Sequence, residues 1–148
     1  MRAATAETAS TDGGIGRGWF WFATATMAAV FLQSVTAGRI LSGDHWARTT
    51  HRVVAGVLVF LVFAAGLAAL VVLRDRTGGR QMAAALLGLA AGLAVEYRLG
   101  AAAADGEDAV WLHVPFGVAI VAVAAQANRL ARRLAESPRL TVKANRHG

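Results

Sequence analysis

The stretch from Val53 to Leu73 contains no charged residue and only aliphatic, aromatic or glycine residues. A helix needs roughly 20 apolar residues to cross the hydrocarbon core of a bilayer. Lipid offers the backbone no hydrogen-bond partners, so a spanning segment of this kind must satisfy its own amides by forming a helix. This segment therefore restricts the chain to an α-helical integral membrane protein.

Three further segments are apolar enough to span, which gives predicted spans at 18–38, 53–73, 81–99 and 109–128. The first opens with an aromatic cluster, Trp19 to Phe22, of the kind that anchors helices at the headgroup boundary. The third is short and rich in alanine, and it reaches full length only by including Glu96, Tyr97 and Arg98. The predicted fold class is all-α, a single integral membrane four-helix bundle over residues 18–128.

Composition excludes several function classes. The chain is 56% hydrophobic with a mean hydropathy of +0.49, and it has no cysteine, which rules out disulfides and thiolate metal sites. Its net charge of +6 comes from basic residues that flank the apolar runs and form no patch interleaved with aromatics. We therefore expect no nucleic-acid partner, and anionic lipid headgroups as the partners of these cations.

The basic residues also predict an orientation, because Lys and Arg accumulate on the cytoplasmic side of membrane proteins. The outer loops of the predicted bundle hold only Arg39, Arg48, Arg52 and Arg98. The two tails and the second loop hold the others: Arg2, Arg17, Arg74, Arg76, Arg80, Arg129, Arg132, Arg133, Arg139, Lys143 and Arg146. We predict that both termini are cytoplasmic and, from the Ala- and Arg-rich composition, that the membrane is a bacterial plasma membrane.

The two tails carry separate expectations. Residues 1–17 are small and polar, and we expect them to be a disordered tail. Residues 129–148 form a basic cytoplasmic tail. Its first part is expected to continue as an amphipathic helix along the anionic inner surface until Pro138 stops it.

Two histidines fall at the outward ends of different spans. His51 precedes the second span and His113 lies near the start of the fourth. Each is followed at i+4, on the same helix face, by a small residue, Ala55 or Gly117, and Gly56 adds space beside Ala55. Helix bundles build cofactor sites from side chains on facing helices, and haem iron accepts imidazole ligands. The pattern thus predicts His51 and His113 as ligands to one haem iron, with room for the macrocycle.

A plainer interpretation stays open. His51 follows Thr49 and Thr50, which resemble a helix cap, so it can be an ordinary residue of the membrane interface. Small residues in membrane helices commonly serve close helix packing. His45, in the first outer loop, is expected to be solvated.

Several short motifs occur along the chain in an order found in a known family. Gln33 and Gly38-Arg39 close the first span, HRVVAG begins at His51, and LHVPFG surrounds His113. Over about residues 31–134 the chain resembles one four-helix half of a haem A synthase. It is also similar to small four-helix bacterial membrane proteins of unknown function. The resemblance implies His51 and His113 as axial ligands of a b-type haem.

The chain departs from haem A synthases in ways that limit the resemblance. It has one half where they have two, and it lacks the cysteines of some members. The first outer loop offers only Asp44 as an acidic residue, in a different context. The family's oxidation of a haem methyl group is therefore not carried over.

Polar residues around the predicted site have expected roles. Arg39, Arg52 and Arg98 are candidate partners for haem propionates, or alternatively snorkel to headgroups. We expect Glu96 to pair with one of these arginines. Gln33 is expected to find a hydrogen-bond partner on another helix and to approach the haem edge.

Two functions follow from this sequence. The first is a cytochrome-like protein that binds haem b for electron transfer or haem handling. The alternative is a cofactor-free scaffold, self-associating or an accessory subunit of a larger membrane complex. A transporter is disfavoured because no carboxylate is expected deep within a span. No nucleophile–base pair, phosphate loop or HExxH motif indicates an enzyme. If the chain is an enzyme, we expect a haem-dependent membrane oxidoreductase.

Overall fold

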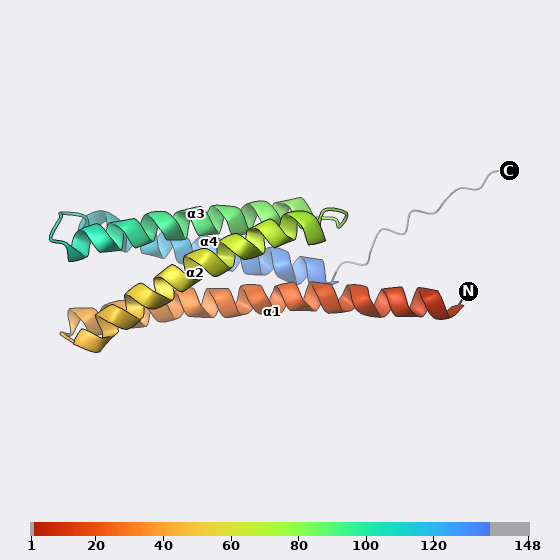
Figure 1. Cartoon of the computed structure of the whole chain (residues 1–148), viewed down its shortest axis with the longest axis horizontal. Helices are drawn as coiled ribbons and strands as arrows, with labels where there is room; N and C mark the ends of the chain where they lie inside the picture. Colours follow the sequence, from red (N-terminus) through yellow and green to blue (C-terminus); the bar gives the residue numbers. More distant parts are fainter. Residues whose placement is uncertain (1, 137–148) are drawn as a thin grey trace.

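The computed structural model describes residues 2–136, with side-chain burial defined from Gly14 onward. Four helices follow one another: α1 (Arg2–Leu41), α2 (His45–Val72), α3 (Gly79–Ala104) and α4 (Val110–Glu136). They run up and down, so α1 begins and α4 ends at the same end of the molecule (Figure 1). We call this the terminal end, and the opposite end, with the α1–α2 and α3–α4 connections, the loop end.

Short connections make this antiparallel arrangement possible. Each of the three turns contains a glycine with a left-handed backbone, at Gly43, Gly78 and Gly106, with φ values of 91°, 81° and 88°. Only glycine adopts this conformation without a steric cost from a Cβ atom. The helices therefore reverse direction within a few residues.

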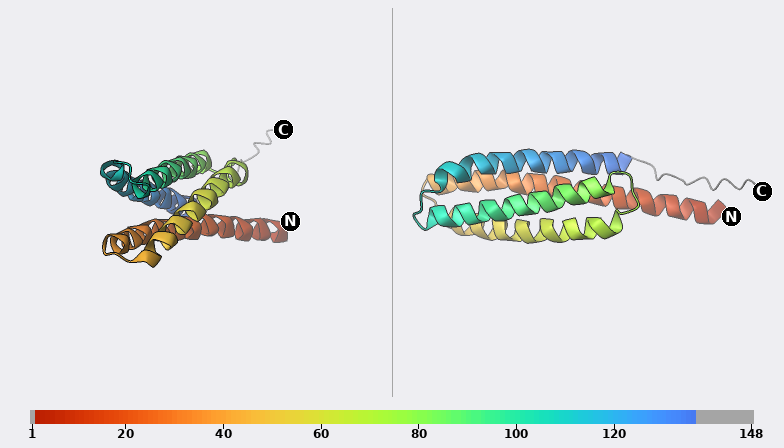
Figure 2. Two further views of the ribbon diagram at one scale, coloured as in Figure 1. Left: turned by 60° about the vertical axis from the view of Figure 1, so that its left-hand side comes forward. Right: turned by 90° about the horizontal axis from the view of Figure 1, so that it is seen from above.

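The helices pack as a ring. Each contacts its neighbours in sequence and α4 closes the ring against α1, whereas the described residues show no close backbone contact between α1 and α3 or between α2 and α4. Helix α2 is inclined to the others, lying near α1 at the loop end and near α3 at the terminal end (Figures 1 and 2). The two helices that carry His51 and His113 are therefore diagonal partners.

Few side chains are buried, and the exposed ones are largely apolar. The core contains Leu58, Val62, Leu86, Leu89 and Ile120, all with less than a tenth of their surface exposed. Outward-facing residues such as Phe60, at 70% exposure, have no protein partner to bury them. Lipid covers such surfaces, and all four helices are long and apolar enough to cross a bilayer. The chain is a multi-pass membrane protein with four spanning helices.

The predicted number of four helices able to span is confirmed, and each helix includes most of one predicted span and extends beyond it. Helix α1 starts at Arg2 and so includes the segment expected to be a disordered tail. The alanines there favour continuation once the spanning helix exists, because extending a helix costs less than starting one. Helix α4 continues past residue 128 to Glu136, as expected for the start of the basic tail. Pro138 and the rest of that tail lie outside the described residues.

Helices α2 and α3 approach each other closely at Gly66. A Cβ atom at this position would lie 2.7 Å from Leu87 Cδ2 and 3.2 Å from the Leu87 backbone nitrogen. The side chain can rotate away but the backbone atom cannot. The α2–α3 contact therefore depends on the missing side chain.

Gly66→Ala is expected to destabilise the bundle by about 1–3 kcal/mol, the usual cost of overpacking a close contact. The matched control is Gly88→Ala on α3, where no atom outside the local helix lies within 4 Å of the added Cβ. That control should be neutral or stabilise by up to about 1 kcal/mol through helix propensity. Thermal unfolding in detergent measures both, and equal midpoints for the two variants would contradict this packing.

Candidate functional site

His51 is held by helix α1. Its ring Nδ1 lies 2.8 Å from Thr36 Oγ1, and its backbone carbonyl accepts a hydrogen bond of 3.0 Å from Gln33 Nε2. Gln33 and Thr36 are three residues apart and so share one face of α1. The expectation that Gln33 bonds to another helix is confirmed.

The hydrogen-bond acceptors around Thr36 bear on which nitrogen of His51 carries the proton. The Thr36 hydroxyl lies 2.9 Å from the Gln33 backbone oxygen and 3.1 Å from Gln33 Oε1, and both oxygens only accept hydrogen bonds. When the single hydroxyl proton is donated to one of them, Thr36 Oγ1 acts as an acceptor towards His51. His51 Nδ1–H then donates to Thr36 Oγ1, which leaves the lone pair on Nε2.

His113 is paired with Glu96 of α3. Nδ1 of His113 lies 2.9 Å from Glu96 Oε1, and the two side chains are 22% and 17% exposed. The distance fits an ion pair, but the groups are not aligned as a hydrogen bond, and Nδ1 and Glu96 Oε2 are buried without a hydrogen-bond partner among the described residues. The pair is close, shielded from water and incompletely satisfied.

The expectation that Glu96 pairs with an arginine is wrong. The span was expected to end near residue 99, with Glu96 at the interface, but α3 continues to Ala104. Glu96 is therefore about 12 Å, at 1.5 Å per residue, from the end of its helix. A carboxylate does lie inside a spanning helix, so the reason for disfavouring a transporter no longer holds.

Helix α3 packs against two of the small residues that were predicted to leave recesses beside the histidines. A Cβ atom at Gly117 would lie 2.9 Å from Glu96 Oε1, and one at Gly56 would lie 3.7 Å from Cε2 of the Tyr97 ring. Ala55, the other predicted recess residue, is half-buried on α2. The His113 ring itself rests against Gly100, where a Cβ would lie 3.0 Å from its Cε1 atom.

The three arginines expected near the haem edge are exposed and lie towards the loop end. Arg39 forms an ion pair of 2.6 Å with Asp44 in the α1–α2 turn. Arg52 Nε lies 3.5 Å from the Tyr97 hydroxyl, which is the long limit for a hydrogen bond. Arg98 follows Tyr97 on α3. Arg39 is thus held by an acidic neighbour, whereas Arg52 contacts only a neutral group through this bond.

The two imidazoles belong to separate clusters at one end of the bundle. His51 contacts Gln33 and Thr36 of α1, and His113 contacts Glu96 of α3. Nε2 of neither ring is hydrogen-bonded to the described residues. No group of three or more His, Cys, Asp or Glu side chains that could hold a metal ion converges within residues 2–136.

A bis-histidine haem can be tested against this geometry. The residue types suit such a group, because two imidazoles come from facing sides of the bundle and Nδ1 of His51 contacts Thr36, whereas Nδ1 of His113 is close to Glu96 without a hydrogen bond. The faces of Gly117 and Gly56 beside the rings are occupied by the ends of the Glu96 and Tyr97 side chains. A macrocycle against these glycines would require both side chains to move.

Sequence reasoning missed Thr36, Tyr97 and Gly100 as parts of this site. Thr36 carried a usable signal, because it follows Gln33 by three residues on an otherwise apolar helix face. Gly100 carried another, since it stands four residues after Glu96 and thus on the same face of α3. Tyr97 gave no signal beyond that of an interfacial aromatic.

No protein-family model, curated protein or solved structure matches the chain. The resemblance to haem A synthases therefore rests on the quoted motifs around Gln33, His51 and His113.

Thr36→Val is expected to destabilise the protein by about 1–3 kcal/mol, because the half-buried His51 Nδ1–H loses its acceptor while the side chain keeps its shape. The control Thr36→Ser retains the hydroxyl and should stay close to the unmodified protein. Thermal unfolding in detergent compares them. If valine and serine are tolerated equally, the assigned hydrogen bond does not form.

Proposed function

We propose that this multi-pass membrane protein binds one b-type haem through Nε2 of His51 and Nε2 of His113. The observation that supports the proposal is a feature that the two rings share. Each Nδ1 faces an oxygen of the protein, Thr36 Oγ1 or Glu96 Oε1, and each Nε2 is left for a ligand. Histidines that bind metals characteristically direct the second ring nitrogen to such a carboxylate or other acceptor.

The positions of the rings support the same proposal. They come from diagonal helices, α2 and α4, so a planar group between them would lie across the middle of the bundle. The helix faces beside the two histidines carry small residues, Ala55 and Gly56 on α2 and Gly117 on α4. Arg52 and Arg98 lie towards the same end, where acidic substituents of the macrocycle would need cations.

Bound haem would supply one-electron redox chemistry. The chain's own residues would set its properties. The Glu96 carboxylate beside His113 increases the donor strength of that ring, whereas the neutral Thr36 hydroxyl leaves His51 the weaker donor. The apolar helix faces exclude water from the iron. These features suit electron transfer or haem handling, and no substrate-binding group is needed for either.

We also propose that the terminal end faces the cytoplasm of a bacterial cell and that the histidine pair lies in the outer leaflet. The distribution of Lys and Arg supports this orientation, with only Arg39, Arg48, Arg52 and Arg98 towards the loop end. A fusion of alkaline phosphatase to the α3–α4 turn tests it. Activity there is expected, whereas activity from a fusion after Glu136 would contradict the orientation.

The visible spectrum tests haem binding. The full chain, purified in detergent from haem-replete cells, is expected to show a six-coordinate low-spin spectrum in both redox states. His51→Ala and His113→Ala should each abolish that low-spin spectrum, because each removes one axial ligand. His45→Ala is the matched control, since His45 is an exposed histidine at the start of the same helix as His51.

A colourless and folded preparation would contradict the proposal and favour the alternative, a cofactor-free scaffold or accessory subunit. A spectrum that survives both His51→Ala and His113→Ala would also contradict it, because the haem would then be bound elsewhere.

A further inference from the structure

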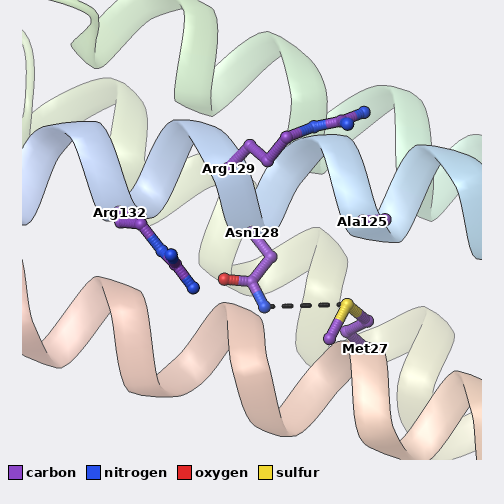
Figure 3. Close-up of a pocket in the computed structure, with 5 residues that line it drawn as sticks. All are labelled: Met27, Ala125, Asn128, Arg129 and Arg132. Carbon is purple, nitrogen blue, oxygen red and sulfur yellow. Dashed lines mark hydrogen bonds between the residues drawn. The ribbon is translucent and has the colours of Figure 1, made fainter.

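A second polar site lies between α1 and α4 towards the terminal end, away from the histidines. The close-up in Figure 3 shows a cavity lined by Met27 from α1 and by Ala125, Asn128, Arg129 and Arg132 from α4. Its volume is about 310 Å³. Asn128 and Arg132 point from α4 toward α1, whereas Arg129 points away from α1 (Figure 3).

The donors of this cavity are only weakly satisfied. Asn128 is buried, at 9% exposure, and its Nδ2 group contacts Met27 Sδ at 3.6 Å, a weak acceptor. Thr24 Oγ1 lies 3.5 Å from Asn128 Oδ1 and already donates to the Phe20 carbonyl at 2.8 Å. A buried amide whose only acceptor is a thioether retains the capacity to donate to an oxygen.

Two arginines, Arg129 and Arg132, lie beside the same cavity. The Arg132 guanidinium lies 5.7 Å from the centre of the Phe20 ring, a cation–π contact that holds it over α1. Arg129 uses Nε for Gln126 Oε1 at 3.0 Å, which leaves its two terminal nitrogens. Arg132 and the Asn128 amide thus point into a cavity with Arg129 at its edge, and its other walls, Met27 and Ala125, are apolar.

We propose that this cavity binds the phosphate headgroup of one anionic phospholipid, with Arg132 and Asn128 as its main donors and Arg129 at its rim. An oxyanion complements both the guanidinium and the weakly bonded amide. The cavity lies between two membrane-spanning helices, near the end of α4 where the sequence becomes basic, which is the depth of a headgroup. The apolar walls suit the glycerol and acyl portion, which a free phosphate lacks.

The packing of α1 against α4 between the cavity and the terminal end supports a lipid that enters from the surrounding membrane. Near the end of α4 the two helices touch, since a Cβ at Gly16 would lie 2.9 Å from the Ala135 Cα atom. This contact limits the space between the helices on the side of the terminal end. A ligand with an acyl chain along the α1–α4 seam fits that geometry. Such a site holds one lipid in a defined place, in contrast to the diffuse attraction of scattered surface cations.

Native mass spectrometry of the full chain in non-ionic detergent tests the proposal, with added phosphatidylglycerol compared with phosphatidylcholine. One phosphatidylglycerol is expected to remain bound, and Arg132→Gln should weaken it about tenfold through loss of a charged donor. The control Arg80→Gln removes an exposed arginine from the first turn of α3 and should have no such effect. Ala125→Leu fills the cavity without changing charge and should also abolish retention.

Equal retention of the two lipids would overturn the proposal, as would an equal effect of Arg80→Gln and Arg132→Gln. Unchanged binding in Ala125→Leu would show that the lipid is held outside the cavity. Release of the lipid by millimolar inorganic phosphate would show that the site binds soluble oxyanions. Retention by Arg132→Lys, together with loss in Arg132→Gln, would support a charged donor at this position.

Discussion

Lipid supplies no hydrogen-bond partner, so a polar side chain at depth in this bundle depends on partners within the protein, on its own helix or on another. Three helix contacts carry such a polar cluster. Gln33 and Thr36 bind His51 between α1 and α2, Glu96 meets His113 between α3 and α4, and Asn128 reaches Met27 and Thr24 between α4 and α1. Apolar packing in lipid specifies rotation and register weakly, because lipid and leucine are equally apolar. These polar contacts therefore define how the four helices face one another.

The same constraint shapes the space between the histidines. Helices α2 and α4 are diagonal, and α3 places Glu96 and Tyr97 into the recesses beside Gly117 and Gly56. In this structure, Gly56 and Gly117 thus leave room for side chains of α3. A ligand between the rings would displace these two side-chain ends, whereas the Thr36 hydroxyl beside His51 Nδ1 would be retained. Glu96 would then move relative to His113, which links ligand binding to the one incompletely satisfied ion pair of the site.

Much of the architecture could be predicted from the sequence, because apolar length alone predicts spanning helices. The four spans and the polar role of Gln33 are confirmed. The partner of Glu96 could not be predicted, since it depends on where α3 ends and how it is rotated. Hydropathy placed the end near residue 99, but the alanines after Gly100 extend the helix to Ala104. Thr36 was overlooked because a threonine in a spanning helix ordinarily bonds only to its own backbone, whereas here it also reaches His51.

The haem proposal requires both imidazoles to bind the same iron. Electron paramagnetic resonance of the oxidised full chain, purified from haem-replete cells, tests this requirement most directly. The predicted result is a low-spin ferric signal of the type given by two imidazole ligands. A preparation with only a high-spin signal, or with no haem signal from folded protein, would contradict it.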